Sequence, residues 1–151
     1  MDLKTAIYRY CNYQERSHKE VRDKLYELGA HTNEVNELIA TLIEDDLVNE
    51  ERFASAFVRG RFRLKHWGRI KITQHLKRHN ISKYLLEKAI KQIDPNEYFD
   101  AVTKLATRKW DSLKSEQDDY KRRGKVYAYL QQKGYESSVI KEVIKELASM
   151  E

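Results

Sequence analysis

A run of basic residues in the middle of the chain carries the most evident chemistry in this sequence. No Asp or Glu occurs in the thirty-five residues from Arg52 to Leu86, although the chain of 151 residues carries 24 acidic residues. Clustered guanidinium and ammonium groups bind carboxylates and phosphates. The run therefore predicts contact with a polyanion, either a nucleic acid or an acidic protein surface. A solvated face that only keeps the protein soluble is the alternative interpretation.

The cations that we expect to make this contact form a main set and an extension. The main set lies between positions 59 and 71, and the extension lies further along the chain. The main set is Arg59, Arg61, Arg63, Lys65, Arg69 and Lys71, and the extension is Lys77, Arg78, Lys121, Arg122, Arg123 and Lys125.

Helical periodicity predicts which face of this basic segment is buried. In the first helix of the segment, the inward stripe is expected to be Phe53, Phe57, Gly60 and Leu64. The cations of the main set then face solvent or lie at the flanks. In the next helix, Ile72 and Leu76 are expected to turn inward, together with Trp67 or Ile70. Trp67 has two interpretations, as a staple between helices or as an exposed interface anchor.

Other reactive side chains do not form a catalytic pattern. Cys11 is the only cysteine, so no internal disulfide can form, and its apolar helical setting predicts a buried thiol. His75 and His79 have i, i+4 spacing and could bind zinc with His66, but the surrounding cations favour a solvent- or phosphate-facing role. We therefore predict no catalytic residue, no metal, no cofactor and no small-molecule substrate, so the protein is not expected to be an enzyme.

Charge is distributed unevenly along the chain. Residues 1–50 have a net charge of −5, residues 51–100 of +7 and residues 101–151 of +3. The acidic cluster Glu44-Asp45-Asp46 has two interpretations, as a solvated helix end or as a contact with a basic partner or with the protein's own basic middle. We expect no signal segment and no membrane span, and we predict a cytoplasmic protein.

The chain repeats itself three times. The segments Val21–Ala30, Ile72–Ile81 and Val126–Tyr135 align without gaps, and each continues into a second apolar stripe. Gly29, Asn80 and Gly134 occupy the same position in these segments. Gly and Asn tolerate the positive φ that often ends a helix, so each of these three residues is predicted to follow a helix C-terminus.

Each repeat has space for three helices. Three helix starts are predicted from capping residues: Ser17 with Glu20, Asn49 before two glutamates, and Asp94 before the only proline. The composition, with one Pro and five Gly, also favours helices. We predict an all-α protein of three tandem three-helix repeats over 1–48, 49–94 and 95–151, in a curved, elongated array. A polar loop is expected near 111–119.

Several motifs carry a family resemblance once the three repeats are in order. The most specific ones are Leu47-x-x-Glu50-Glu51-Arg52-Phe53-Ala54, then Phe57-Val58-x-x-Arg61, then Gly68-x-x-x-Ile72-x-x-x-Leu76. Together with the third repeat they resemble the RecX family of recombination regulators, from about Ala6 to Leu147. The chain departs from the usual family pattern at Asn49-Glu50, Arg69 and Asn80, where the family often has an Asp pair, Pro and Gly.

The resemblance implies a function. Proteins of this family are bacterial and cytoplasmic, are not enzymes, and bind the RecA nucleoprotein filament in its helical groove. They usually inhibit RecA ATPase, strand exchange and co-protease activity, and so act on homologous recombination and the SOS response. Contact with single-stranded DNA is possible in such a complex. The alternative is a helical nucleic-acid-binding protein that acts on DNA directly, without RecA.

Overall fold

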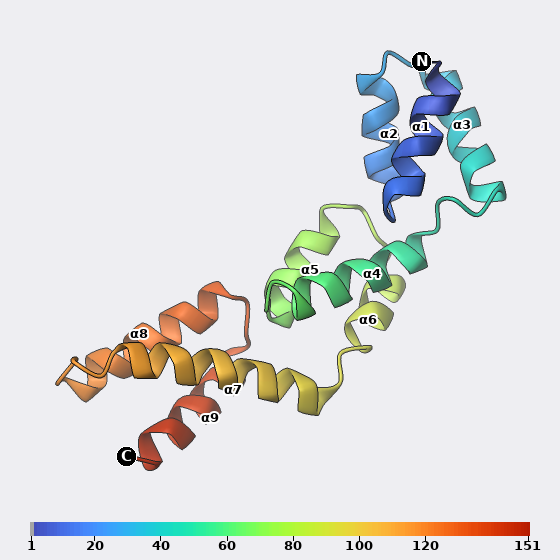
Figure 1. The fold of residues 1–151 in the computed structure, drawn as a ribbon. Helices are drawn as coiled ribbons and strands as arrows, with labels where there is room; N and C mark the ends of the chain where they lie inside the picture. The colour runs from blue at the N-terminus through green and yellow to red at the C-terminus, as the bar shows by residue number, and fades with distance from the viewer. Residues whose placement is uncertain (1) are drawn as a thin grey trace. The chain divides into compact units, whose positions relative to one another are not determined.

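The structure is a computed structural model that describes residues 2–151, and this range contains nine α-helices and no β-strand (Figure 1). The helices are α1 Leu3–Tyr13, α2 His18–Glu27, α3 Thr32–Glu44, α4 Glu50–Arg63, α5 Arg69–Lys77, α6 Lys83–Ile90, α7 Pro95–Ser112, α8 Asp119–Gln132 and α9 Ser137–Ser149. The predicted all-α fold is confirmed. Within the same range, no helix is long and apolar enough to cross a membrane.

The predicted helix starts are confirmed. Ser17 accepts a hydrogen bond from the backbone N–H of Glu20, whose side chain accepts one from the N–H of Ser17, which completes a capping box before α2. The side chain of Asn49 accepts the N–H of Arg52 at 2.9 Å. Asp94 caps α7 in the same way, with Pro95 as the first helical residue.

The predicted helix ends are also confirmed. Gly29, Asn80 and Gly134 have φ values of 91°, 57° and 98°. Two further residues adopt positive φ without having been predicted to do so, Asp46 at 57° and His66 at 59°. Asp and His take this conformation less readily than glycine, so composition alone gives little indication of these two turns.

The chain consists of two compact units, and each unit combines two segments that are separate in the sequence. One unit runs to Phe57 and also includes His75–Ala89, while the other comprises Val58–Gln74 and Ile90–Glu151. Helices α4, α5 and α6 are therefore each divided between the units. Compact units and sequence repeats are different partitions of this chain, and the repeat boundaries at 48/49 and 94/95 remain predictions.

The first unit has an apolar core built from α1, α2 and α3. Its buried members are Ile7, Cys11, Val21, Leu25, Ala30, Val35, Ile39, Leu42 and Val48. Their spacing within each helix is the i, i+3, i+4 pattern of one helical face. The thiol of Cys11 is buried, as predicted, and burial raises its pKa to about 11.

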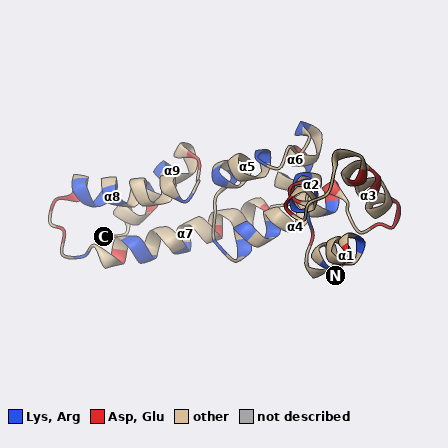
Figure 2. Cartoon of the chain, turned by 90° about the horizontal axis from the view of Figure 1, so that it is seen from above, with Lys and Arg blue, Asp and Glu red and all other residues tan. Residues whose placement is uncertain are grey.

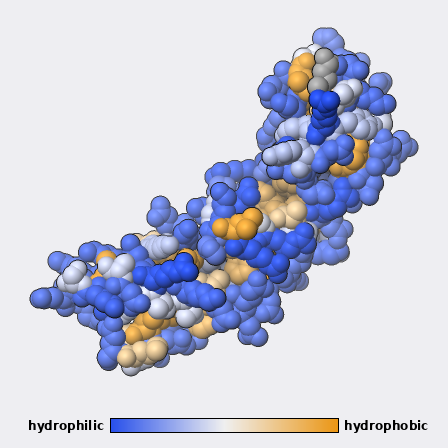
Figure 3. Space-filling view, in the orientation of Figure 1, coloured by the Kyte–Doolittle hydropathy of each residue, from blue (hydrophilic) through white to orange (hydrophobic). Residues whose placement is uncertain are grey.

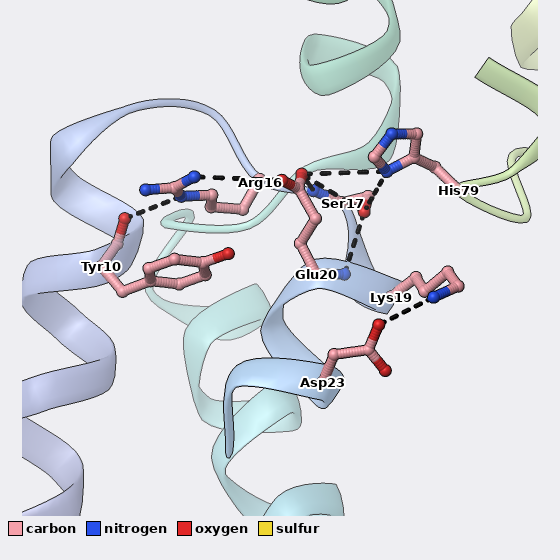
Figure 4. A network of polar contacts seen from close by, with 7 residues as sticks. All are labelled: Tyr10, Arg16, Ser17, Lys19, Glu20, Asp23 and His79. Carbon is pink, nitrogen blue, oxygen red and sulfur yellow. Dashed lines mark hydrogen bonds and ion pairs between the residues drawn. The ribbon is translucent and has the colours of Figure 1, made fainter. Parts of the chain in front are cut away.

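A polar network in the first unit includes a histidine from the turn after α5 (Figure 4). Nδ1 of His79 lies 3.0 Å from Oγ of the buried Ser17. The His79 ring also packs against the rings of Phe53 and Phe57, with centroid distances of 4.9 and 5.5 Å. The prediction of a solvent- or phosphate-facing His79 is therefore wrong. The side chain lies between the α2 capping box and the inward face of α4.

In the second unit, α7, α8 and α9 pack against one another. Large buried side chains at this packing include Tyr98, Trp110 and Tyr135. The chain between Ser112 and Asp119 forms the connection from α7 to α8. The ring of Phe62 in α4 stacks on that of Tyr98, with centroids 5.8 Å apart, so the end of α4 shares this core.

Candidate partner-binding surface

The end of α4 presents a row of cations, and Figure 2 shows basic residues along this helix. Arg59, Arg63 and Lys65 are exposed and Arg61 is half-buried, which is the predicted arrangement. Within the described range, Arg59 and Lys65 make no ion pair, whereas Arg63 Nε lies 3.2 Å from Glu97 Oε1 in α7. Positive charge at the end of a helix also interacts favourably with the helix dipole.

The buried face of α4 differs from the predicted one at its end. Gly60 and Leu64 were expected to turn inward. Gly60 is instead partly exposed, with nothing within 4 Å of a Cβ built on it, and Leu64 is 82% exposed, while Val58 and Phe62 are buried. A single stripe was assumed for the whole helix. The structure instead gives α4 two apolar faces, since Phe53 and Phe57 are buried in the first unit and Phe62 in the second.

Trp67 lies between two cations of the predicted set. The Arg61 guanidinium is 5.6 Å from the centre of the indole, and Lys71 Nζ is 4.5 Å from it. Such cation–π contacts hold flexible basic side chains in fixed positions. The indole is partly buried, which agrees more closely with a staple between the α4 end and the α5 start than with a fully exposed anchor.

The start of α5 binds the turn between α8 and α9 through backbone groups. The N–H of Gly68 donates to the carbonyl of Lys133 at 2.8 Å, and the N–H of Ile70 donates to that of Gly134 at 2.9 Å. A Cβ on Gly68 would lie 2.4 Å from the Gly134 carbonyl group, so only glycine allows this approach. These bonds satisfy amides that a helix start leaves without partners.

Arg69 takes part in this junction and is only partly exposed. Its N–H donates to Oη of Tyr98 at 2.9 Å, and its Nη1 donates to Oε2 of Glu136, also at 2.9 Å. Tyr98 donates its own hydroxyl hydrogen to Oε1 of Glu136. Burial and this hydrogen bond raise the pKa of Tyr98. The expectation that Arg69 simply faces solvent is wrong, because its guanidinium is held over the Tyr98 ring at 3.9 Å.

Arg122 in α8 is buried and is therefore not available as a contact residue. Its Nε and Nη2 donate to the carbonyl of Trp110 at 3.2 and 2.8 Å, and its Nη1 donates to Glu151 at 2.9 Å. The sequence contains a signal that predicts this burial. Arg122 stands four residues before Val126 and eight before Leu130, both buried, so it lies on the apolar stripe.

The remaining cations of the extension differ in their surroundings. Arg123 Nε lies 2.7 Å from Asp119, and Lys125 Nζ lies 3.1 Å from Glu116. Lys121 is exposed and makes no ion pair within residues 2–151. In the first unit, the exposed Lys77 and Arg78 are likewise without an ion pair to any described residue.

Two residues of the acidic cluster at the end of α3, Asp45 and Asp46, contact other residues of the same chain. Asp46 accepts a hydrogen bond from Arg52 at 3.1 Å, and Arg52 also donates to Glu15 at 2.6 Å. Asp45 accepts the hydroxyl hydrogen of Tyr8 at 2.7 Å. Arg52 thus joins Arg63 and Arg69 among the cations of the acid-free run that pair with a carboxylate of the same chain. No group of three or more potential metal ligands occurs in the part of the chain that the structure describes.

These features describe a helical-repeat protein with exposed basic segments. Three family models match in order, for the first, second and third three-helix domains of RecX, at residues 4–42, 49–90 and 96–144. The chain belongs to the RecX family of regulatory proteins.

Relatives and solved structures agree with this assignment. Regulatory protein RecX of Clostridium perfringens strain 13 is 32% identical over 98% of this chain and 69% of the relative. Regulatory protein RecX of Clostridium botulinum strain Eklund 17B is 34% identical over 90% of this chain and 64% of the relative. The crystal structure of RecX from Lactobacillus salivarius is 27% identical and superposes with a TM-score of 0.85, covering 97% of this chain and 94% of that chain.

Proposed function

We propose that this protein binds the RecA filament on single-stranded DNA and lowers RecA ATPase, strand exchange and co-protease activity. It would thereby restrain homologous recombination and the SOS response in the cytoplasm. Membership of the RecX family supports this proposal. RecA–DNA filaments combine protein carboxylates with DNA phosphates, and both are ligands for exposed Arg and Lys.

The observation that carries the proposal is the exposed end of α4. Arg59 and Lys65 have no internal ion pair within the described residues, so their charge is available to a partner without displacing a carboxylate. Arg61, Arg63 and Lys71 add charge nearby in the chain. Arg69 acts as a positioning residue, and Arg122 is withdrawn from the contact set because it is buried.

The first experiment measures the ATPase of the cognate RecA on single-stranded DNA. The protein is added after filaments have formed, at far fewer copies than RecA. We expect the ATPase rate to fall, because so little protein cannot remove the DNA by competition. An unchanged rate would contradict regulation of the filament.

The second candidate is direct nucleic-acid binding without RecA, which the acid-free run also supports. It predicts tight binding to bare DNA that weakens steeply with salt. In that case the ATPase would fall only when the protein meets the DNA first and in excess. Comparison of the two orders of addition therefore separates the candidates.

A further inference from the structure

Gly60 lies inside α4, and the fold gives no reason for a glycine there. The helix continues to Arg63, and Gly60 is not among the described glycines with positive φ. A Cβ built on it would meet nothing within 4 Å. Glycine in a helix interior is less stable than alanine, so the residue costs stability without a local structural benefit. Gly68 is different, because a Cβ there would collide with the α8–α9 turn.

The surroundings of Gly60 provide charge and one apolar side chain. Arg59 is its neighbour in sequence and is exposed. Leu64 lies four residues further on, which places it on the same helical face, and it is 82% exposed. Figure 3 shows mostly hydrophilic residues on the visible surface, with apolar ones in small areas. The helix face at Gly60 therefore combines partly exposed backbone without a side chain, the positive charge of Arg59 and the apolar side chain of Leu64.

We propose that an acidic segment of the partner protein lies directly against α4 at Gly60, with Leu64 as its apolar contact. The missing side chain lets the segment approach the helix backbone, and Arg59 and Lys65 bind its carboxylates. This inference rests on the proposed function, which makes RecA the partner, and it locates the protein contact on this chain.

Leu64 is the reason for choosing a protein segment over a nucleic-acid strand. An exposed leucine gains free energy when apolar surface covers it, at about 25 cal/mol per Å². A segment that contains both acidic and apolar side chains can cover Leu64 and neutralise Arg59 at once. A phosphodiester backbone supplies the charge but no apolar surface.

Gly124 in α8 provides a matched control. It is also a helix-interior glycine, a Cβ on it would meet nothing within 4 Å, and it stands between Arg123 and Lys125. Those two cations already contact Asp119 and Glu116 within the chain. The same substitution at Gly124 therefore changes helix stability in the same way, without touching a face on which a neighbouring cation, as Arg59 does at Gly60, lacks an ion pair within the described residues.

The experiment compares four variants in the full chain: Gly60→Ala, Gly60→Leu, Gly124→Ala and Gly124→Leu. Both alanine variants should raise Tm by about 2 °C, because alanine favours the helix. Gly60→Ala should raise the concentration for half-inhibition of RecA ATPase by about fivefold, and Gly60→Leu by about thirtyfold. The Gly124 variants should inhibit like the wild type, and binding of all four to bare oligo-dT should be unchanged.

Three results would overturn the inference. Wild-type inhibition by Gly60→Leu would show that no partner lies against this face. Equal losses at Gly60 and Gly124 would show a general effect of helix stiffening. Loss of oligo-dT binding in Gly60→Leu would assign the face to nucleic acid. Each of these three results requires that the wild type inhibits RecA. A wild type that does not inhibit RecA would instead contradict the proposed function itself, so the two failures are distinguishable.

Discussion

The end of α4 and the start of α8 carry nearly the same tripeptide in very different electrostatic settings. Arg59-Gly60-Arg61 has Ser55 one helical turn before its first cation, whereas Arg123-Gly124-Lys125 has Asp119 at the corresponding place. In α8, Nε of Arg123 lies 2.7 Å from Oδ2 of Asp119. The charge that a basic tripeptide offers to a partner thus depends on the residue four positions earlier, which a count of cations does not include.

The largest effect is expected from Gly68→Ala. This substitution disrupts the contact between the segment that follows α4 and the α8–α9 turn. The new Cβ would lie 2.4 Å from backbone atoms of the α8–α9 turn, and rigid backbone cannot move aside cheaply. We expect a loss of about 3 kcal/mol or more in unfolding free energy. Urea unfolding followed by circular dichroism measures it, with Gly60→Ala as the control that should be stabilised. A loss below about 1 kcal/mol would mean that the junction yields easily.

Charge reversal tests the comparison directly. The double variant Arg59→Glu with Lys65→Glu should raise the concentration for half-inhibition of RecA ATPase by about thirtyfold, or about 2 kcal/mol. The matched variant Lys121→Glu with Lys125→Glu should change it by about threefold or less, because α8 offers less unpaired charge. Helicity of both variants is checked by circular dichroism. Equal losses would show that the two helices contribute alike.

Within α8, adjacent arginines should behave differently. Arg122→Ala removes two of the hydrogen bonds to the Trp110 carbonyl and a cation–π contact at 3.8 Å, so we expect a loss of about 2 kcal/mol in stability. Arg123→Ala removes an exposed ion pair and should cost about 0.5 kcal/mol or less. Thermal unfolding of the two variants and the wild type measures these differences in stability. If Arg122→Ala is as stable as the wild type but inhibits poorly, Arg122 would return to the contact set.

The smallest effect concerns pH. Burial, followed by the hydrogen bond to Glu136, raises the pKa of Tyr98 above its ordinary value of about 10. A raised pKa in the folded state gives stability that is complete below pH 10 and is lost as pH rises further. Above pH 10, the wild type should therefore lose up to about 1.4 kcal/mol per pH unit more than Tyr98→Phe. Parallel stability profiles for the two proteins between pH 9 and 11 would contradict this account.

Local signals predicted the helices and their ends well. Capping by Ser17, Asn49 and Asp94 and positive φ at Gly29 and Gly134 depend on residues a few positions apart, so a sequence contains them in full. Positive φ at Asp46 and His66 was missed, because these residue types usually adopt other conformations.

The candidate surface was predicted less completely. Outward positions for Arg59 and Lys65 followed from periodicity, but Leu64 is exposed although burial was expected, and the buried Phe62 was not part of the predicted stripe. Phe62 is buried against Tyr98, which comes from a later repeat, and no pattern within α4 specifies that neighbour. Arg69 was misjudged for the same reason, since its partners Tyr98 and Glu136 are distant in sequence. The burial of Arg122 could have been predicted, because Arg122 lies four residues before the buried Val126 on the same helical face.

The backbone junction at Gly68 limits how such proteins can exchange parts. The amides of Gly68 and Ile70 depend on carbonyls of Lys133 and Gly134, far along the chain. A hybrid that joins the first two repeats of this protein to the third repeat of a relative would therefore inherit only half of this junction. Such chimeras should fold well only if the donor repeat also brings a glycine-bearing turn that matches Gly68. The Gly68 segment and the Gly134 turn must therefore be exchanged together, although they belong to different sequence repeats.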